Sequence, residues 1–201
     1  MAVMVEHPVS IEHPQGTPEF RELLQTLLEL DEHVPDGYRT EIIGGKIVMS
    51  PWSKGYYFPV MRSLRRQLEP HLPEGHVVDS APYLFTFPAA ERAYGPDVFA
   101  AAEGAFRTER RHIDGEALSL AAELTSTSTR NADVHDKVTA YGKGTVPVYL
   151  LLDMQKSAAT LFWQPTDEGY AAQTTVPFGE KLRVPAPFDC DLDTSEFLPA
   201  E

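Results

Sequence analysis

Two carboxylates stand at the edges of apolar stretches in the middle of the chain. Asp97 follows Gly95-Pro96 and precedes the run "VFAAA", and Glu123 closes the run "ALSLAA". A charge in such a position is costly to desolvate unless it is paired or binds a metal. If the two strands are neighbours, both carboxylates can converge and offer the hard oxygen ligands that Mg²⁺ takes. Acids at strand ends are also common as loop-facing residues, so this pattern leaves both interpretations open.

Hydrolysis of a phosphodiester at such a site is commonly assisted by a lysine two residues after the glutamate. Here that position is Thr125, and the next lysine is Lys137. A nearby ammonium can orient the attacking water or stabilise the negative charge that develops. The stretch "AAELTSTSTRNADVHDK" is therefore a site without its lysine, a rearranged site, or no site.

The elements that would position these residues indicate an α/β or α+β sheet protein. Thr17-Pro18 is typical of a helix start, and the apolar residues that follow have helical spacing. Gly44-Gly45 divides "YRTEIIGGKIVMS" (38–50) into two β-rich arms, which predicts a hairpin. Further helices are expected over 55–71 and 131–143. Strands are expected over 76–80, 82–87, 97–101, 117–124, 146–153, 158–164, 169–176 and 180–184.

Composition sets limits on the class of protein. The 201 residues, 42% of them hydrophobic, fit one core, and we expect a flexible arm over 1–16 and a single domain over 17–201. The one cysteine, Cys190, excludes an intrachain disulfide and a cysteine-based zinc cluster, and fits a reducing cytosol. No apolar stretch approaches the roughly 20 residues that span a bilayer.

The net charge of −13 argues against a nucleic-acid binder, because phosphate contacts need lysine and arginine. The acids, however, gather at the two ends: residues 1–36 carry −7 and residues 153–201 carry −6, while residues 37–152 are neutral. The middle of the chain can still present a local basic surface. Two arginine groups are candidates for it, or else ordinary solvated positions: Arg62, Arg65 and Arg66, and Arg107, Arg110 and Arg111.

The order and spacing of "EIIGGKIV", "GPDVF" and "AELTSTSTRNADVHDKVTAYGKGTVPVYLLLD" resemble the Uma-two family of restriction endonuclease-like proteins, the domain of unknown function eight-twenty. That family belongs to the PD-(D/E)XK nuclease superfamily. The resemblance covers about 17–185. It implies a restriction-endonuclease-like PD-(D/E)XK α/β core, with a central mixed sheet flanked by helices.

Matching position by position, the resemblance implies Asp97 and Glu123 as metal ligands, with Glu41 of the hairpin nearby. It moves the catalytic lysine to the following helix, which makes Lys137 the candidate. Asp133, four residues earlier on the same helical face, could orient Lys137 or simply pair with it. Ser126, Ser128 and Thr129 match a hydroxyl-rich turn.

The chain departs from the family pattern at four positions, none of which is a proposed ligand. Gly44 and Lys46 replace acids of the hairpin, Thr127 replaces a proline, and Thr145 replaces a glycine. Lys137 could still be a solvated lysine, and His135 is either an exposed histidine or a base. Trp52, Tyr56 and Tyr57 could stack on bases, pack in the core or form a dimer contact.

The prediction is a magnesium-dependent DNA endonuclease that uses Mg²⁺ or Mn²⁺, with catalytic residues Asp97, Glu123, Lys137 and Glu41. We expect a cytoplasmic homodimer with DNA as its partner and no membrane association. The alternative is a non-catalytic nucleic-acid-binding or protein-interaction module that keeps the nuclease fold. The net charge favours that alternative.

Overall fold

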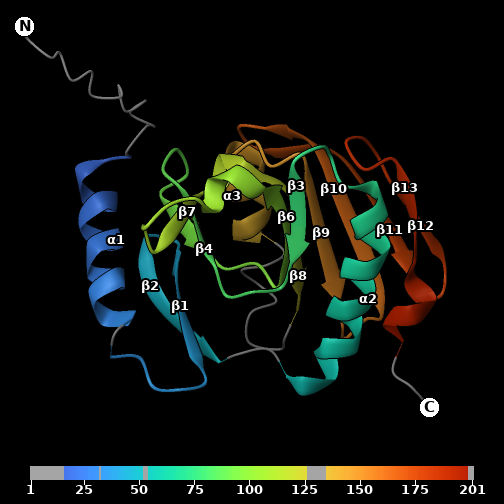
Figure 1. The fold of residues 1–201 in the computed structure, drawn as a ribbon, viewed down its shortest axis with the longest axis horizontal. Coiled ribbons are helices and arrows are strands. Elements are labelled where there is room, and N and C mark those ends of the chain that lie inside the picture. The colour runs from blue at the N-terminus through green and yellow to red at the C-terminus, as the bar shows by residue number, and fades with distance from the viewer. Residues whose placement is uncertain (1–15, 32, 52–53, 126–134, 199–201) are drawn as a thin grey trace, which may run out of the picture.

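The computed structural model describes residues 16–31, 33–51, 54–125 and 135–198. Within these ranges the strands form two sheets and a separate hairpin (Figure 1). The first sheet has the order β2 (Lys46–Pro51), β1 (Tyr38–Ile43), β5 (Arg92–Tyr94), β4 (Leu84–Phe87) and β7 (His112–Asp114). The second has the order β11 (Gly169–Pro177), β10 (Ala158–Thr166), β9 (Val148–Asp153), β8 (Leu118–Leu124), β6 (Val98–Ala102) and β3 (His76–Asp79). The hairpin pairs β12 (Lys181–Val184) with β13 (Cys190–Asp193).

Three α-helices in the described part of the chain lie against these sheets. Helix α1 (Pro18–Asp31) contacts β1 and β2 at one end of the molecule, as Figure 1 shows. Helix α2 (Phe58–Leu68) contacts β3, β6 and β13, and α3 (Lys137–Lys143) contacts β9, β10 and β11. Short 3₁₀ helices cover Gly55–Tyr57, Glu69–His71, Glu103–Phe106, Gly115–Ala117 and Thr194–Phe197. None of the helices in the described part of the chain is long and apolar enough to cross a membrane.

Short-range features of the sequence explain why the helix and strands that border the site form where they do. The hydroxyl of Thr17 accepts a hydrogen bond from the Phe20 N–H, which satisfies one free donor at the start of α1. Gly44 and Gly45 both have positive φ, as the two-residue turn between β1 and β2 requires. Every residue of β8 is buried, because β6 and β9 flank this strand and both of its faces are covered. A central strand of this kind holds its side chains rigidly.

The predicted mixed α/β fold is confirmed, with the strands divided between two sheets. The predicted hairpin and the eight further predicted strands are present, with bounds that differ by a few residues. Three short strands, β5, β7 and β13, were not predicted. The helix predicted over 131–143 is described as α3 from Lys137. Its earlier part, up to residue 134, lies outside the described residues, as do residues 1–15 of the predicted arm.

Candidate active site

The junction between the two sheets brings the predicted carboxylates together. Residues 95–97 run directly from β5 of one sheet to β6 of the other. Strands β6 and β8 pair antiparallel with Val98 beside Ala122, and Asp97 and Glu123 are the residues next to this pair in the two segments. The N–H of Leu124, the residue after Glu123, donates to Asp97 Oδ2 over 2.8 Å. Glu41 approaches from β1, and its Oε1 accepts from the Gly95 N–H over 3.0 Å.

Lys137 lies between the two glutamates. Its Nζ is 2.8 Å from Glu123 Oε1 and 3.4 Å from Glu41 Oε1, and all three side chains are only 1% exposed. Tyr141, one helical turn later on α3, donates its hydroxyl to the same Glu123 oxygen over 2.8 Å. Helix α3 therefore presents a cation and a hydroxyl donor to the end of β8.

Arg39 is the second cation of this group, and the sequence analysis did not select it. Its Nη1 donates to the Gly95 carbonyl over 2.7 Å and lies 3.3 Å from Asp97 Oδ1. Arg39 and Glu41 are two residues apart on β1, so their side chains leave the strand on the same face. Once Glu41 had been chosen, the alternation of side chains along a strand would have pointed to Arg39. We call Arg39, Glu41, Asp97, Glu123 and Lys137 the acid–cation cluster.

The ionisation of the acid–cation cluster follows from its pairing. Burial opposes the charged form of Glu41, but Lys137, Arg39 and the Gly95 N–H together hold the pKa of Glu41 below its usual value. Burial likewise opposes the charged form of Arg39, and the surrounding carboxylates hold its pKa above the usual value. Burial and the neighbouring Glu123 charge raise the pKa of Tyr141 well above its usual value. The hydroxyl of Tyr141 therefore remains a donor at neutral pH.

A second network fixes the residue that precedes Lys137. Asp136 accepts two hydrogen bonds from Arg92, each 3.1 Å long, and one from the Tyr94 hydroxyl over 2.6 Å. The Tyr94 ring lies 5.3 Å from Lys137 Nζ, within the range of a cation–π contact. Burial opposes ionisation of Asp136, but these hydrogen bonds hold its pKa below the usual value. The start of α3 is thus attached to β5.

The donor set suits a hard divalent cation. Glu41, Asp97 and Glu123 supply carboxylate oxygens, which are the ligands that Mg²⁺ prefers. In the described residues no group of three acidic, histidine or cysteine side chains is already arranged around one ion position. Arg39 and Lys137 instead contact these oxygens, so an ion would compete with them. The three carboxylates outnumber the two cations, which leaves one formal negative charge to attract an ion.

The other candidates from the sequence have different surroundings. Tyr57 is buried and donates to the Thr125 carbonyl, whereas Tyr56 is exposed. Arg65 and Arg66 pair with Asp79 and Glu196 on the surface. His135 is exposed, and Arg111 donates to the Leu28 carbonyl. Candidates that lie outside the described residues are Trp52, Ser126, Thr127, Ser128, Thr129 and Asp133.

Comparison with known proteins places this arrangement in a family. The family model described as "Uma2: Putative restriction endonuclease" matches residues 22–196. No curated protein matches the chain.

A solved structure shares the fold. It is the crystal structure of "a putative nuclease belonging to DUF820" from Anabaena variabilis ATCC 29413. The similarity has a TM-score of 0.64 at 16% identity and covers 85% of this chain and 96% of that one. Because the family model spans most of the chain, this protein belongs to the Uma2 family.

Proposed function

We propose that this protein is a metal-dependent endonuclease that hydrolyses phosphodiester bonds in DNA. The observation that carries the proposal is the buried Lys137 ammonium between Glu41 and Glu123, with Asp97 on the adjoining strand. Membership of a family described as "Putative restriction endonuclease", and the fold shared with "a putative nuclease", support it. Asp97 and Glu123 are the proposed ligands of Mg²⁺ or Mn²⁺, and Glu41 supports the site.

Lys137, Tyr141 and Asp136 each have a defined part in this proposal, beside the part of the ion. A divalent ion, when bound, supplies neutralisation of phosphoryl charge and a lowered pKa for water. Lys137 stabilises negative charge on the phosphoryl oxygens from a position that burial and Glu41 keep fixed. Tyr141 holds the Glu123 carboxylate in one orientation through its hydroxyl. Asp136 keeps the first turn of α3 in place through Arg92 and Tyr94.

One observation favours the second candidate, a non-catalytic nucleic-acid-binding or protein-interaction module that keeps the nuclease fold. The acid–cation cluster is almost sealed: the Asp97 side chain is 4% exposed, and those of Glu41, Glu123 and Lys137 are each 1% exposed. A buried group of charges that pair with one another can equally serve only to hold the fold together, without any part in catalysis. Only a cleavage assay separates the two candidates.

The test is cleavage of supercoiled plasmid in Mg²⁺ or Mn²⁺ by the wild type, Asp97→Ala and Lys137→Ala. Lys143→Ala serves as the matched control, because Lys143 is an exposed lysine on the same helix. We expect cleavage by the wild type and the control, its loss in the other two, and its loss in EDTA. Equal cleavage by all four proteins would identify a contaminant and refute the proposal. Failure of the wild type to cut any DNA would favour the binding module.

The predicted homodimer belongs to the same proposal, since nucleases that cut both strands of a duplex often work as dimers. Light scattering on the purified protein measures its mass directly. A monomer that still linearises plasmid would refute the dimer.

A further inference from the structure

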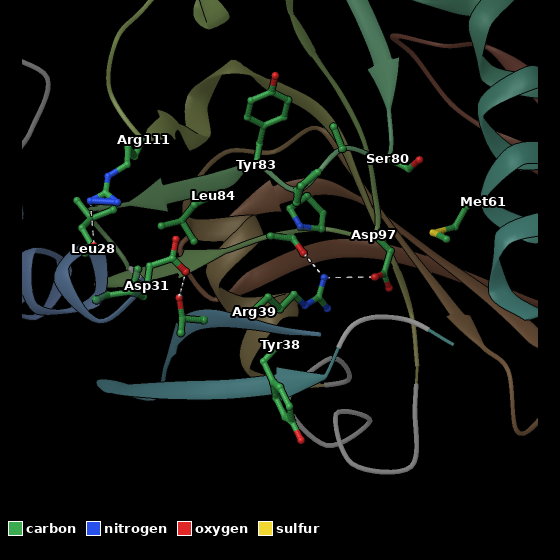
Figure 2. A pocket seen from close by; sticks show the side chains of 16 residues that line it. Leu28, Asp31, Tyr38, Arg39, Met61, Ser80, Tyr83, Leu84, Asp97 and Arg111 are labelled. Carbon is green, nitrogen blue, oxygen red and sulfur yellow. Dashed lines mark hydrogen bonds and ion pairs between the residues drawn. The ribbon is translucent and has the colours of Figure 1, made fainter. Parts of the chain in front are cut away.

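Arg39 connects the acid–cation cluster to a large cavity. The cavity has a volume of about 450 Å³, which falls in the range of small-ligand sites. Figure 2 shows Arg39 and Asp97 at its edge, with Leu28 and Leu84 on one side and Met61 and Ser80 on the other. Asp97 thus borders both the cavity and the acid–cation cluster.

The guanidinium of Arg39 has donors that the fold leaves unpaired. Its two described hydrogen bonds, to the Gly95 carbonyl and to Asp97, both use Nη1. Nε is buried and has no hydrogen-bond partner among the described residues. A guanidinium carries five N–H donors in a planar fork, and two of its nitrogens together can bind a phosphate in a bidentate manner. A buried donor without a partner is costly, so its presence beside a cavity calls for a ligand.

We propose that Arg39 binds a phosphodiester group of a nucleic-acid strand that enters this cavity. The proposal rests on the proposed function. It names the contact that would bring the sugar–phosphate backbone of the nucleic acid to Asp97. The raised pKa of Arg39 keeps it charged, and its planar fork matches a phosphate better than a lysine does. Because Nε is sealed from solvent, binding requires the guanidinium to rotate toward the cavity.

The surroundings of Arg39 favour this occupant. Leu28 and Leu84 give the cavity apolar walls, which suit a sugar and a base beside the charged group. Arg111, which donates to the Leu28 carbonyl, lines the same cavity, whereas Arg65 and Arg66 do not.

The test measures binding without hydrolysis. A short fluorescein-labelled single-stranded DNA oligonucleotide is titrated with the full chain in EDTA over a range of NaCl concentrations, with fluorescence anisotropy as the readout. We expect Arg39→Gln to weaken binding about tenfold, the loss expected for one charge-assisted phosphate contact. We also expect it to reduce the slope of log K against log[salt] by about one. Arg183→Gln, an exposed arginine on β12 outside the cavity, is the matched control, and its effect is expected to be much smaller.

A second variant protects the test against misfolding, because Arg39→Gln removes the partner of a buried Asp97. Arg39→Lys keeps the charge and the pairing but lacks the fork, so it should retain the salt slope and lose affinity. Wild-type affinity in either variant, once folded, would overturn the proposal. So would a wild type that does not bind the oligonucleotide. The cleavage assay judges the proposed nuclease function separately.

Discussion

Replacing Lys137 with methionine tests the central feature of the site, a cation that two buried glutamates share. Methionine keeps most of the apolar stem and removes the ammonium. Glu41 and Glu123 would then remain in the interior without the charge that lies 3.4 and 2.8 Å from them. Removing one partner of a buried pair typically costs about 3–5 kcal/mol.

The loss of unfolding free energy in Lys137→Met can be bounded from the free energy of protonating a glutamate. The variant can relieve the uncompensated charge if one carboxyl takes up a proton. From the ordinary glutamate pKa of 4.5, protonation at pH 7 costs about 3 kcal/mol, at about 1.4 kcal/mol per pH unit. At pH 5 the same proton costs under about 1 kcal/mol. We therefore expect Lys137→Met to lose about 3 kcal/mol of unfolding free energy at pH 7, and much less at pH 5.

The sign of this pH dependence follows from the two folded states. In the wild type the pKa of Glu41 is lowered, so its contribution is present above the ordinary pKa and is lost only as the pH falls below it. In the variant a glutamate pKa is raised, so the penalty grows as the pH rises from 5 to 7. The difference between the two proteins must shrink on acidification through this window.

The assay is urea unfolding followed by circular dichroism at pH 5, 6 and 7. Lys143→Met is the control, since Lys143 is exposed near the end of α3 and should change little. Adding Glu123→Gln to Lys137→Met should restore part of the loss at pH 7. A loss below about 1 kcal/mol at pH 7, or one that is equal at pH 5 and pH 7, would refute the reasoning.

Three further predictions concern the supports of the site. Tyr141→Phe removes the hydroxyl that donates to Glu123 and should cost about 1.5–3 kcal/mol in urea unfolding. Asp136→Asn weakens the attachment of α3 and should cost about 1 kcal/mol at pH 7, discounted for partial exposure. Because the pKa of Asp136 is lowered, this cost should begin to shrink only below about pH 4 and vanish as the pH falls through the lowered pKa. Gly142→Ala would place a Cβ 1.9 Å from the Gly169 carbonyl oxygen, and should lower the melting temperature through a loss of about 2 kcal/mol or more.

Each of these predictions has a contrary outcome. Unchanged stability of Tyr141→Phe would show that its hydrogen bond is replaced on mutation. An Asp136→Asn difference that does not shrink as the pH falls below 4 would show that the charge of Asp136 is not its source. Gly104→Ala is the control for the third variant, because a Cβ at Gly104 has no atom within 4 Å. A Gly142→Ala melting temperature equal to that of Gly104→Ala would show that the contact between α3 and β11 is loose.

The elements next to the site could be predicted from local sequence. The Gly44-Gly45 pair predicts the turn, and the apolar runs after Asp97 and before Glu123 predict β6 and β8, because these signals lie within a few residues of one another. The short strand β5 carries too few residues to be predicted. It nevertheless supplies Tyr94 and Arg92 to the attachment of α3.

The sequence was enough to predict the fold class and to choose Asp97, Glu123 and Lys137 as candidate site residues. Both rest on the edges of apolar runs and on the spacing of the family motifs, which are properties of the chain itself. Tertiary structure alone decided what these residues contact. Arg39 became the partner of Asp97, and Asp136 became the residue that attaches the start of α3 to β5. The partners of Arg39 and Asp136 lie 58 and 44 residues away. No local pattern encodes such pairs, because burial and the meeting of two sheets select them.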